Sequence, residues 1–218
     1  MRVINWQSML TMVGASNSTT HVTVYHALNG TDLVHGFRVV TVSSSNDITP
    51  FLDDTGKLPT HILDGDNIRA LTTEEAALWP GWVTAYYTKV KVQRIGNAGN
   101  AIKSDLSMDH DPKAITFAWE SEILKMMVVN QERYPAKVLQ LALNNYAVFH
   151  TDSPERGFNG KDGFRHGLCL NSCYKNDDER YVELIDNDHY VLPYTHRGTN
   201  LGHLCPPRCR KTTEVGKL

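Results

Sequence analysis

Hydrophobic and polar residues alternate along much of the chain, a pattern typical of β-strands with one buried face. Residues 21–25 and 33–42 are also rich in β-branched residues, and the Asn29-Gly30 pair between them predicts a hairpin turn. Residues 82–95 alternate over the longest stretch and predict another strand. Further strands are predicted at 114–119, 123–129, 137–149, 180–185 and 189–194. The pattern therefore predicts a chain made mainly of β-strands.

Two segments have the spacing of a helix instead. Apolar side chains in the first dozen residues recur at helical intervals, and Gly14 would end this helix. The residues of this stripe are Val3, Trp6, Met9, Leu10 and Val13. Residues 72–75 form a capping box that predicts a short helix through Trp79, which Pro80-Gly81 would stop. The segments 123–129 and 137–149 also suit a helix, because Leu, Met, Ala and Gln favour helices.

These elements predict an antiparallel β-sandwich with a few short flanking helices, because two packed sheets bury the apolar faces of their strands. A chain of 218 residues is long enough for one domain with its own core. We expect an N-terminal helical arm over residues 1–14 and a single β-sandwich domain over residues 15–218. Polar stretches predict long surface loops at 43–71 and 151–164, and the C-terminal tail is expected to be irregular.

The charges of the chain nearly cancel. The 22 Lys and Arg residues face 24 Asp and Glu residues, which leaves a formal charge of −2. This balance argues against a specific nucleic-acid binder, which normally carries excess positive charge. It favours association between copies, because little net charge keeps them apart. No stretch approaches about 18 consecutive apolar residues, and no signal-peptide pattern is found, so we expect no membrane contact and a cytoplasmic location.

The four cysteines form two pairs, Cys169 with Cys173 and Cys205 with Cys209, and three residues separate the members of each pair. In a cytosolic protein, cysteines are thiols or metal ligands rather than disulfides. Four sulfur ligands could hold a tetrahedral zinc ion, although two intervening residues are the usual spacing. The simpler alternative is that these cysteines are small buried apolar residues. The sequence leaves both open.

The same region follows the order of an HNH nuclease box. His189 would activate water, Asn200 would orient that histidine, and the cysteine pairs would help to hold a metal ion. The spacing from histidine to asparagine is short for such a box, and the charge balance disfavours a DNA enzyme. Neither a nucleophile elbow nor a phosphate-binding loop occurs in the chain. A metal-dependent nuclease therefore remains an alternative.

Residues 179–194, ERYVELIDNDHYVLPY, resemble the C-terminal part of the cypovirus polyhedrins, where an Arg-Tyr, a Glu-Leu and an Asn-x-His-Tyr followed by Pro occur in this order. Residues 23–34 (TVYHALNGTDLV) are similar to the first long β-hairpin of that family. Residues 90–101 (VKVQRIGNAGNA) are similar to a strand that ends in a Gly-Asn-Ala turn. Residues 119–126 (WESEILKM) are similar to a mid-chain strand that begins with Trp-Glu. The segments are collinear with the family, whereas the tail from Cys205 to Leu218 has no counterpart.

The resemblance implies a compact antiparallel β-sandwich with helices on its flanks and a structural role without a catalytic site. Polyhedrins form trimers that pack into crystals, the occlusion bodies, in the cytoplasm of the infected insect cell. These crystals embed and protect virus particles and dissolve in the alkaline larval midgut. An N-terminal helix reaches neighbouring trimers in that family, and here the stripe from Val3 to Val13 would take this role. The partners would be copies of the chain and virus particles, with no cofactor beyond nucleotides trapped in the lattice or zinc at the cysteine pairs.

Alkaline release would have a chemical basis in this composition. The chain holds 11 Lys, 9 Tyr and 4 Cys, whose protons are lost at about pH 8.5 to 10.4. Their loss would add like charge throughout a dense lattice, and buried tyrosines would lose hydrogen bonds that need the phenolic proton. The tyrosines expected at contacts are Tyr86, Tyr87, Tyr181, Tyr190 and Tyr194.

Three functions from different classes therefore remain. The first is a polyhedrin-type matrix protein, which is not an enzyme. The second is the HNH-like nuclease, which predicts a bound metal ion and loss of cutting when His189 is replaced. The third is a viral capsid or coat β-sandwich, which would build closed shells rather than an open lattice.

Overall fold

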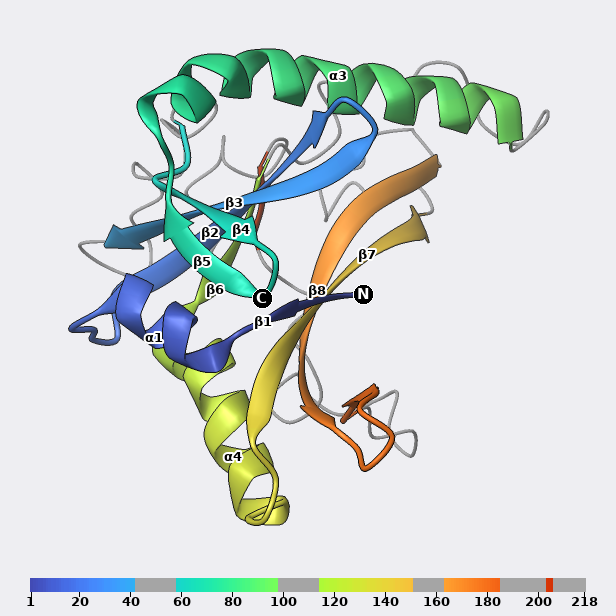
Figure 1. The fold of residues 1–218 in the computed structure, drawn as a ribbon. Coiled ribbons are helices and arrows are strands. Elements are labelled where there is room, and N and C mark those ends of the chain that lie inside the picture. The colour runs from blue at the N-terminus through green and yellow to red at the C-terminus, as the bar shows by residue number, and fades with distance from the viewer. Residues whose placement is uncertain (42–57, 98–113, 151–162, 185–202, 206–218) are drawn as a thin grey trace.

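A computed structural model of the chain describes residues 1–41, 58–97, 114–150, 163–184 and 203–205 (Figure 1). Its strands form two antiparallel sheets. The four-stranded sheet has the order β1-β7-β8-β9, with β1 at Arg2–Ile4, β7 at Leu139–His150, β8 at Gly163–Lys175 and β9 at Tyr181–Glu183. The six-stranded sheet has the order β10-β6-β2-β3-β4-β5. Its strands are β2 (Thr20–Asn29), β3 (Asp32–Thr41), β4 (His61–Asp64), β5 (Asn67–Ala70), β6 (Ala114–Ala118) and β10 (His203–Cys205).

The predicted mainly β fold of antiparallel sheets with flanking helices is confirmed. The hairpin around Asn29-Gly30 is β2 and β3, whose register runs from Thr20 opposite Thr41 to Asn29 opposite Asp32. Gly30 has a φ of 63°, which suits glycine better than any other residue. The predicted strand at 114–119 is β6, the one at 137–149 is β7, and the one at 180–185 contains β9.

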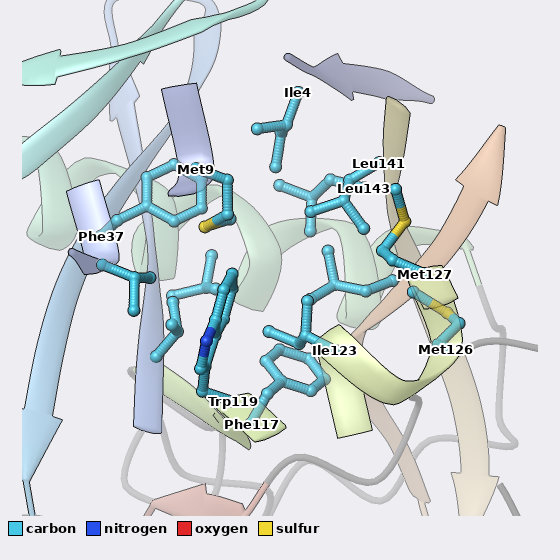
Figure 2. Packing of buried hydrophobic residues seen from close by; sticks show 14 of the residues in the cluster. Ile4, Met9, Phe37, Phe117, Trp119, Ile123, Met126, Met127, Leu141 and Leu143 are labelled. Carbon is cyan, nitrogen blue, oxygen red and sulfur yellow. The ribbon is translucent and has the colours of Figure 1, made fainter. Parts of the chain in front are cut away.

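The main hydrophobic core lies between the two sheets. It joins side chains of β1, β7 and β8 on one side to side chains of β2, β3 and β6 on the other. The helices α1 (Trp6–Val13) and α4 (Lys125–Arg133) close it. Figure 2 shows Met9, Phe37 and Trp119 gathered at one side of this core, with Leu141 and Ile123 at the other. All five side chains are at most 2% exposed. Removing one of these large side chains would cost about 2–5 kcal/mol of stability.

The N-terminus differs from the expected continuous helix. Arg2–Ile4 are strand β1, in which Val3 lies opposite Ala142 of β7. Helix α1 follows at Trp6–Val13. Asn5 starts it, because its side-chain oxygen accepts a hydrogen bond from the backbone N–H of Ser8 at 3.0 Å. Val3 is thus part of a sheet, whereas the other four residues of the stripe lie on the helix.

Residues 2–13 are also tied into the fold and do not form a projecting arm. Met9 is fully buried and Val13 is 7% exposed, both in the main core. Trp6 stacks on Trp119 with ring centroids 5.5 Å apart, and its backbone N–H donates to Oε1 of Gln140 in β7. On the six-stranded sheet, the backbone N–H of Ile68 in β5 donates a hydrogen bond to the Oγ of Ser8. The apolar stripe therefore has its partner within its own chain, which corrects the expectation of an outward contact helix.

The segment predicted as the longest strand is helical. Helix α3 spans Thr73–Asn97 and contains Pro80, and it runs across the β2–β3 hairpin in Figure 1. Trp79, Trp82, Val83 and Tyr86 pack against the hairpin side and recur at i, i+3, i+4 and i+7, which is helical spacing. This burial offsets the hydrogen bond that Pro80 cannot donate, a loss of about 3 kcal/mol in a helix interior. The predicted stop at Pro80-Gly81 is therefore wrong.

The capping box at the start of α3 is confirmed. The Oγ1 of Thr72 accepts from the backbone N–H of Glu75 at 3.2 Å, and the carboxylate of Glu75 accepts from the backbone N–H of Thr72 at 2.9 Å. Glu75 also accepts two hydrogen bonds from the guanidinium of Arg69 in β5, at 2.7 and 2.8 Å. These contacts hold the pKa of Glu75 at about 2. The same guanidinium pairs with Asp64 at 2.7 Å, which links α3 to the β4–β5 hairpin.

Of the two segments that suited either a strand or a helix, 123–129 is helical, whereas 137–149 is the strand β7. A π-helix, η4, spans Trp119–Leu124 and continues into α4 at Lys125–Arg133. Its buried residues include Trp119, Ile123, Met126 and Met127, whose spacing is helical rather than alternating. Both the strand predicted at 123–129 and the strand that the family resemblance implied at 119–126 are therefore wrong. The strand implied at 90–101 is likewise helix α3 as far as Asn97.

The remaining predictions fall partly outside the described residues. The surface connection expected at 43–71 contains a hairpin, β4 with β5, and its part at 42–57 is not described. Of the loop expected at 151–164, Gly163 and Phe164 belong to β8. The strand predicted at 189–194 and the tail after residue 205 lie outside the described residues. No helix among the described residues is long and apolar enough to span a membrane.

Candidate functional site

Two buried histidines lie side by side on the β2–β3 hairpin. His26 and His35 are opposite each other in the strand register, and they are 0% and 1% exposed. Their ring centroids are 5.7 Å apart in an edge-on arrangement. Tyr86 of α3 stacks on His26 at 5.3 Å, with the ring planes 6° apart. Polar rings are seldom buried this completely, so this cluster and its surroundings form the candidate site.

The surroundings of His35 keep it neutral. Burial lowers its pKa to about 4, the positive charge of Arg2 adds to this effect, and a backbone interaction with Tyr25 offsets only part of it. A neutral imidazole has one donor nitrogen and one acceptor nitrogen. Within the described residues, neither ring nitrogen of His35 has a hydrogen-bond partner of good geometry. The backbone of Tyr25 can engage only the ring N–H of a neutral His35, so the other ring nitrogen can still accept a hydrogen bond.

A pocket of about 340 Å³ lies beside this histidine. Arg2 of β1 lines one part of it, residues 32–35 of β3 line another, and residues 63–65 at the β4–β5 turn complete it. The pocket thus draws on both sheets. Its charged groups are Arg2, Asp32 and Asp64.

A second polar cluster lies on the four-stranded sheet around Glu183 of β9. The amide of Asn144 donates to both carboxylate oxygens at 3.0 Å, and the amide of Asn171 donates to one of them at 2.7 Å. These bonds join β9 to β7 across β8. Because the carboxylate oxygens of Glu183 already accept from two amides, we assign this cluster a structural role.

Glu122 in η4 carries an unusual carboxyl group. Burial raises its pKa to about 7, although its Oε2 accepts a hydrogen bond from the backbone N–H of Ala118, which favours the ionised form. The carboxyl therefore titrates near neutral pH. It lies on the helix that contributes Trp119 and Ile123 to the core, so its charge state bears on stability.

The tyrosines named as alkaline sensors have different surroundings. Tyr86 is buried at 6% exposure against His26 and Leu28. Tyr181 is half-buried on β9, with the Nζ of Lys175 at 5.5 Å from its ring centroid. Tyr87 lies on α3, but its side chain is not described, and Tyr190 and Tyr194 lie outside the described residues. Tyr86 is therefore the alkaline-sensing candidate that the structure buries.

Cys169 and Cys173 are too far apart to bind one zinc ion together. Cys169 and Cys173 both lie on β8, opposite Asn144 and Gln140. An extended strand advances about 3.3 Å per residue, so these two positions are about 13 Å apart. That separation is too large for one zinc ion or one disulfide. Cys173 is fully buried, and burial, followed by the charge of Glu183, raises its pKa to about 12.

The other residues of the metal-site and nuclease alternatives are only partly described. Cys205 lies on β10 and pairs with Ala114 of the six-stranded sheet, so it is on the other sheet from Cys173. His189, Asn200 and Cys209 lie outside the described residues. Across the described parts of the chain, no group of three His, Cys, Asp or Glu residues could hold a metal ion. A zinc site elsewhere, and nucleotides trapped in an assembly, stay predictions.

Comparison of the chain with protein-family models, with curated proteins and with solved structures gives no match. The functional argument therefore depends on the residues of this chain.

Sequence reasoning missed the histidine pair, although the hairpin turn held the signal. Once Asn29 and Asp32 flank the turn, counting back along both strands places His26 opposite His35. Nothing in that count shows that both rings are buried. Their burial depends on α3, and the sequence was interpreted as a strand there.

Proposed function

We propose that this chain is a structural protein that assembles into intracellular crystals of the polyhedrin type. Such crystals would be occlusion bodies that embed and protect virus particles in the cytoplasm of an infected insect cell and release them at alkaline pH. The observation that carries the proposal is the collinear sequence resemblance of four segments to the cypovirus polyhedrins. Residues 23–34 lie in the hairpin that this resemblance implies, whereas residues 90–97 and 119–126 are helical rather than strands. The mainly β fold with flanking helices agrees with the architecture of that family.

The described surface suits assembly in several directions. Large apolar side chains are exposed at Leu78 of α3 (48%), at Val128 of α4 (48%) and at Val138 just before β7 (78%). Single exposed apolar residues are common on monomers. Here they belong to α3, to α4 and to the segment before β7, and a three-dimensional lattice needs contacts on more than one face. A formal charge of −2 adds little repulsion between copies.

The N-terminal segment enters this proposal in a changed role. The burial of Met9 and Val13 means that the stripe from Val3 to Val13 stabilises the subunit. The contact surface of α1 would instead be its other side, where Gln7 and Thr11 are exposed. Lattice contacts through the stripe itself would first require α1 to leave the core.

Alkaline release would begin at buried tyrosine. Tyr86 packs between α3 and the β2–β3 hairpin, and its ionisation would leave a charge among apolar side chains. The cost of that charge would loosen α3 from the sheet. The half-buried Tyr181 is a weaker candidate, because water reaches it and the ammonium of Lys175 lies over its ring.

Expression in insect cells tests this proposal. Light and electron microscopy should show faceted bodies in the cytoplasm that disappear when the lysate is made strongly alkaline. Tyr86→Phe should move dissolution to higher pH, whereas the matched change Tyr134→Phe, at a tyrosine that is 40% exposed, should not. A soluble, monodisperse protein would contradict the proposal. Closed shells of uniform radius would favour the coat-protein alternative.

A further inference from the structure

Three groups with unused bonding capacity meet at the pocket between the sheets. Arg2 donates from Nη2 to the carbonyl of Leu33 at 3.1 Å and makes no ion pair within the described residues. Asp32, at the start of β3, makes no ion pair there either. His35 is 1% exposed and lines the pocket, and the backbone of Tyr25 can engage only one of its two ring nitrogens, which leaves the other without a partner among the described residues. Arg2 and Asp32 are exposed to water. The imidazole of His35 is buried, and buried polar groups in native proteins usually have partners, so its unpartnered nitrogen calls for an explanation.

The charges around the pocket have both signs. Arg2 is positive and Asp32 is negative, and the two do not pair with each other. Asp64 also lines the pocket, and its carboxylate accepts from the guanidinium of Arg69 at 2.7 Å; because Arg69 also pairs with Glu75, it balances only part of this negative charge. Asp32 would therefore repel a purely anionic ligand, and Arg2 would repel a purely cationic ligand. A ligand with one group of each sign could satisfy both residues.

The volume limits the size of that ligand. A pocket of about 340 Å³ is at the lower end of the range for small-molecule sites, which is roughly 300–1,000 Å³. A molecule with a handful of heavy atoms would fill part of it and leave room for a few waters, each of which takes about 30 Å³. The lining is largely polar, with apolar walls from Leu33, Val34 and Leu63.

We propose that this pocket binds a small zwitterion of the free α-amino acid class. Its carboxylate would accept hydrogen bonds from the guanidinium of Arg2. Its ammonium group would donate to the carboxylate of Asp32 and to the free ring nitrogen of His35. An arginine fork suits a carboxylate in both geometry and charge. This site does not depend on the proposed lattice function, because all its residues belong to one copy of the chain.

Equilibrium dialysis of the full chain at neutral pH against a mixture of the common amino acids tests the proposal. The method works for dissolved and for assembled protein alike. At least one amino acid should be retained at a stoichiometry near one per chain. The strongest binder is then compared with its decarboxylated amine and with its deaminated acid. Each analogue should bind about tenfold more weakly or worse, because each leaves one charged partner in the pocket unpaired.

Matched variants locate the site. Arg2→Gln and Asp32→Asn remove one charge each at the pocket, and each should weaken binding by about tenfold or more. Arg180→Gln and Asp178→Asn make the same changes at exposed positions outside the pocket and should leave binding unchanged. Circular dichroism and the unfolding midpoint show whether the pocket variants fold. Retention of no amino acid by the parent chain, or equal binding by parent and folded pocket variants, would overturn the proposal.

Discussion

Replacing His35 with leucine should remove the part of the acid sensitivity of this fold that comes from its buried imidazole. The folded protein holds the pKa of His35 at about 4, against an ordinary value of about 6.5. The unfolded chain therefore binds the proton more readily in this window. The contribution to stability is complete above pH 6.5, and it is lost as the pH falls from 6.5 to about 4. The loss amounts to about 2 kcal/mol at pH 5 and about 3 kcal/mol at pH 4.

His35→Leu keeps a side chain of similar size and has no proton to gain. Its free energy of unfolding should stay within about 1.5 kcal/mol of the parent value at pH 7.5, because volume-conserving changes in a core are tolerated. Between pH 6.5 and pH 4 it should lose about 2–3 kcal/mol less than the parent. Urea unfolding followed by the fluorescence of the four tryptophans at pH 7.5, 6, 5 and 4 measures this difference.

A second histidine supplies the control. His61 of β4 is only partly buried, which lowers its pKa less than that of His35. His61→Gln should therefore follow the parent curve closely at every pH. The burial argument would be refuted if His35→Leu lost as much stability as the parent between pH 6.5 and pH 4.

Four further predictions follow from single residues. Glu122→Gln should stabilise the protein by about 1–3 kcal/mol at pH 8 and have little effect at pH 4.5, as urea titration at both pH values would show. Burial holds the pKa of the Glu122 carboxyl at about 7, so at pH 8 the folded state must ionise a group that burial disfavours as a charge, whereas at pH 4.5 the carboxyl stays protonated. Gly36→Ala should lower the stability by about 1–3 kcal/mol, since a Cβ there would lie 2.5–2.7 Å from neighbouring side-chain carbons. Gly81→Ala in α3 meets no atom within 4 Å and should be neutral or stabilising by up to about 1 kcal/mol, and thermal unfolding compares the two variants. Cys173 should resist alkylation at pH 8 until urea unfolds the chain, as peptide mapping by mass spectrometry would show, because burial raises its pKa to about 12. Tyr86→Phe should raise the midpoint of alkaline unfolding of the dissolved protein, measured by circular dichroism, because it removes an ionisable group from a buried contact.

Local signals in the sequence predicted the parts of the fold that depend on neighbouring residues. The turn at Asn29-Gly30 and the alternation on either side predicted the β2–β3 hairpin, whose register the structure then supplies. The capping box at Thr72 and Glu75 gave the start of α3. In each case, the hydrogen bonds join residues that are close in sequence or are set by a two-residue turn.

Where the same residues fit both the alternation of a strand and the spacing of a helix, tertiary packing determines which one forms. The segment after Pro80 alternates as a strand does, yet Trp79, Trp82, Val83 and Tyr86 also have helical spacing, and the hairpin buries the helical face. Pro80 does not end the helix, because its fixed φ is compatible with a helix and only one hydrogen bond is lost.

The candidate site was not predictable from the sequence because its residues come from separate elements. Arg2 belongs to β1, which pairs with β7 in the four-stranded sheet. It lines the pocket together with residues of β3 and of the β4–β5 turn, which belong to the other sheet. The sequence pattern indicates that the N-terminal stripe is apolar, but it does not indicate a partner within the chain. The structure places Trp119, from the middle of the sequence, against Trp6, and no local pattern indicates that contact.

The central claim is that copies of this chain build an ordered lattice inside the cell. Powder diffraction from a washed pellet of insect cells that express the full chain tests it most directly. The account predicts sharp rings from the pellet at neutral pH and their loss once the pH is raised above the ordinary pKa of tyrosine, about 10. Diffuse scattering alone at neutral pH, with the protein recovered in the soluble fraction, would contradict it.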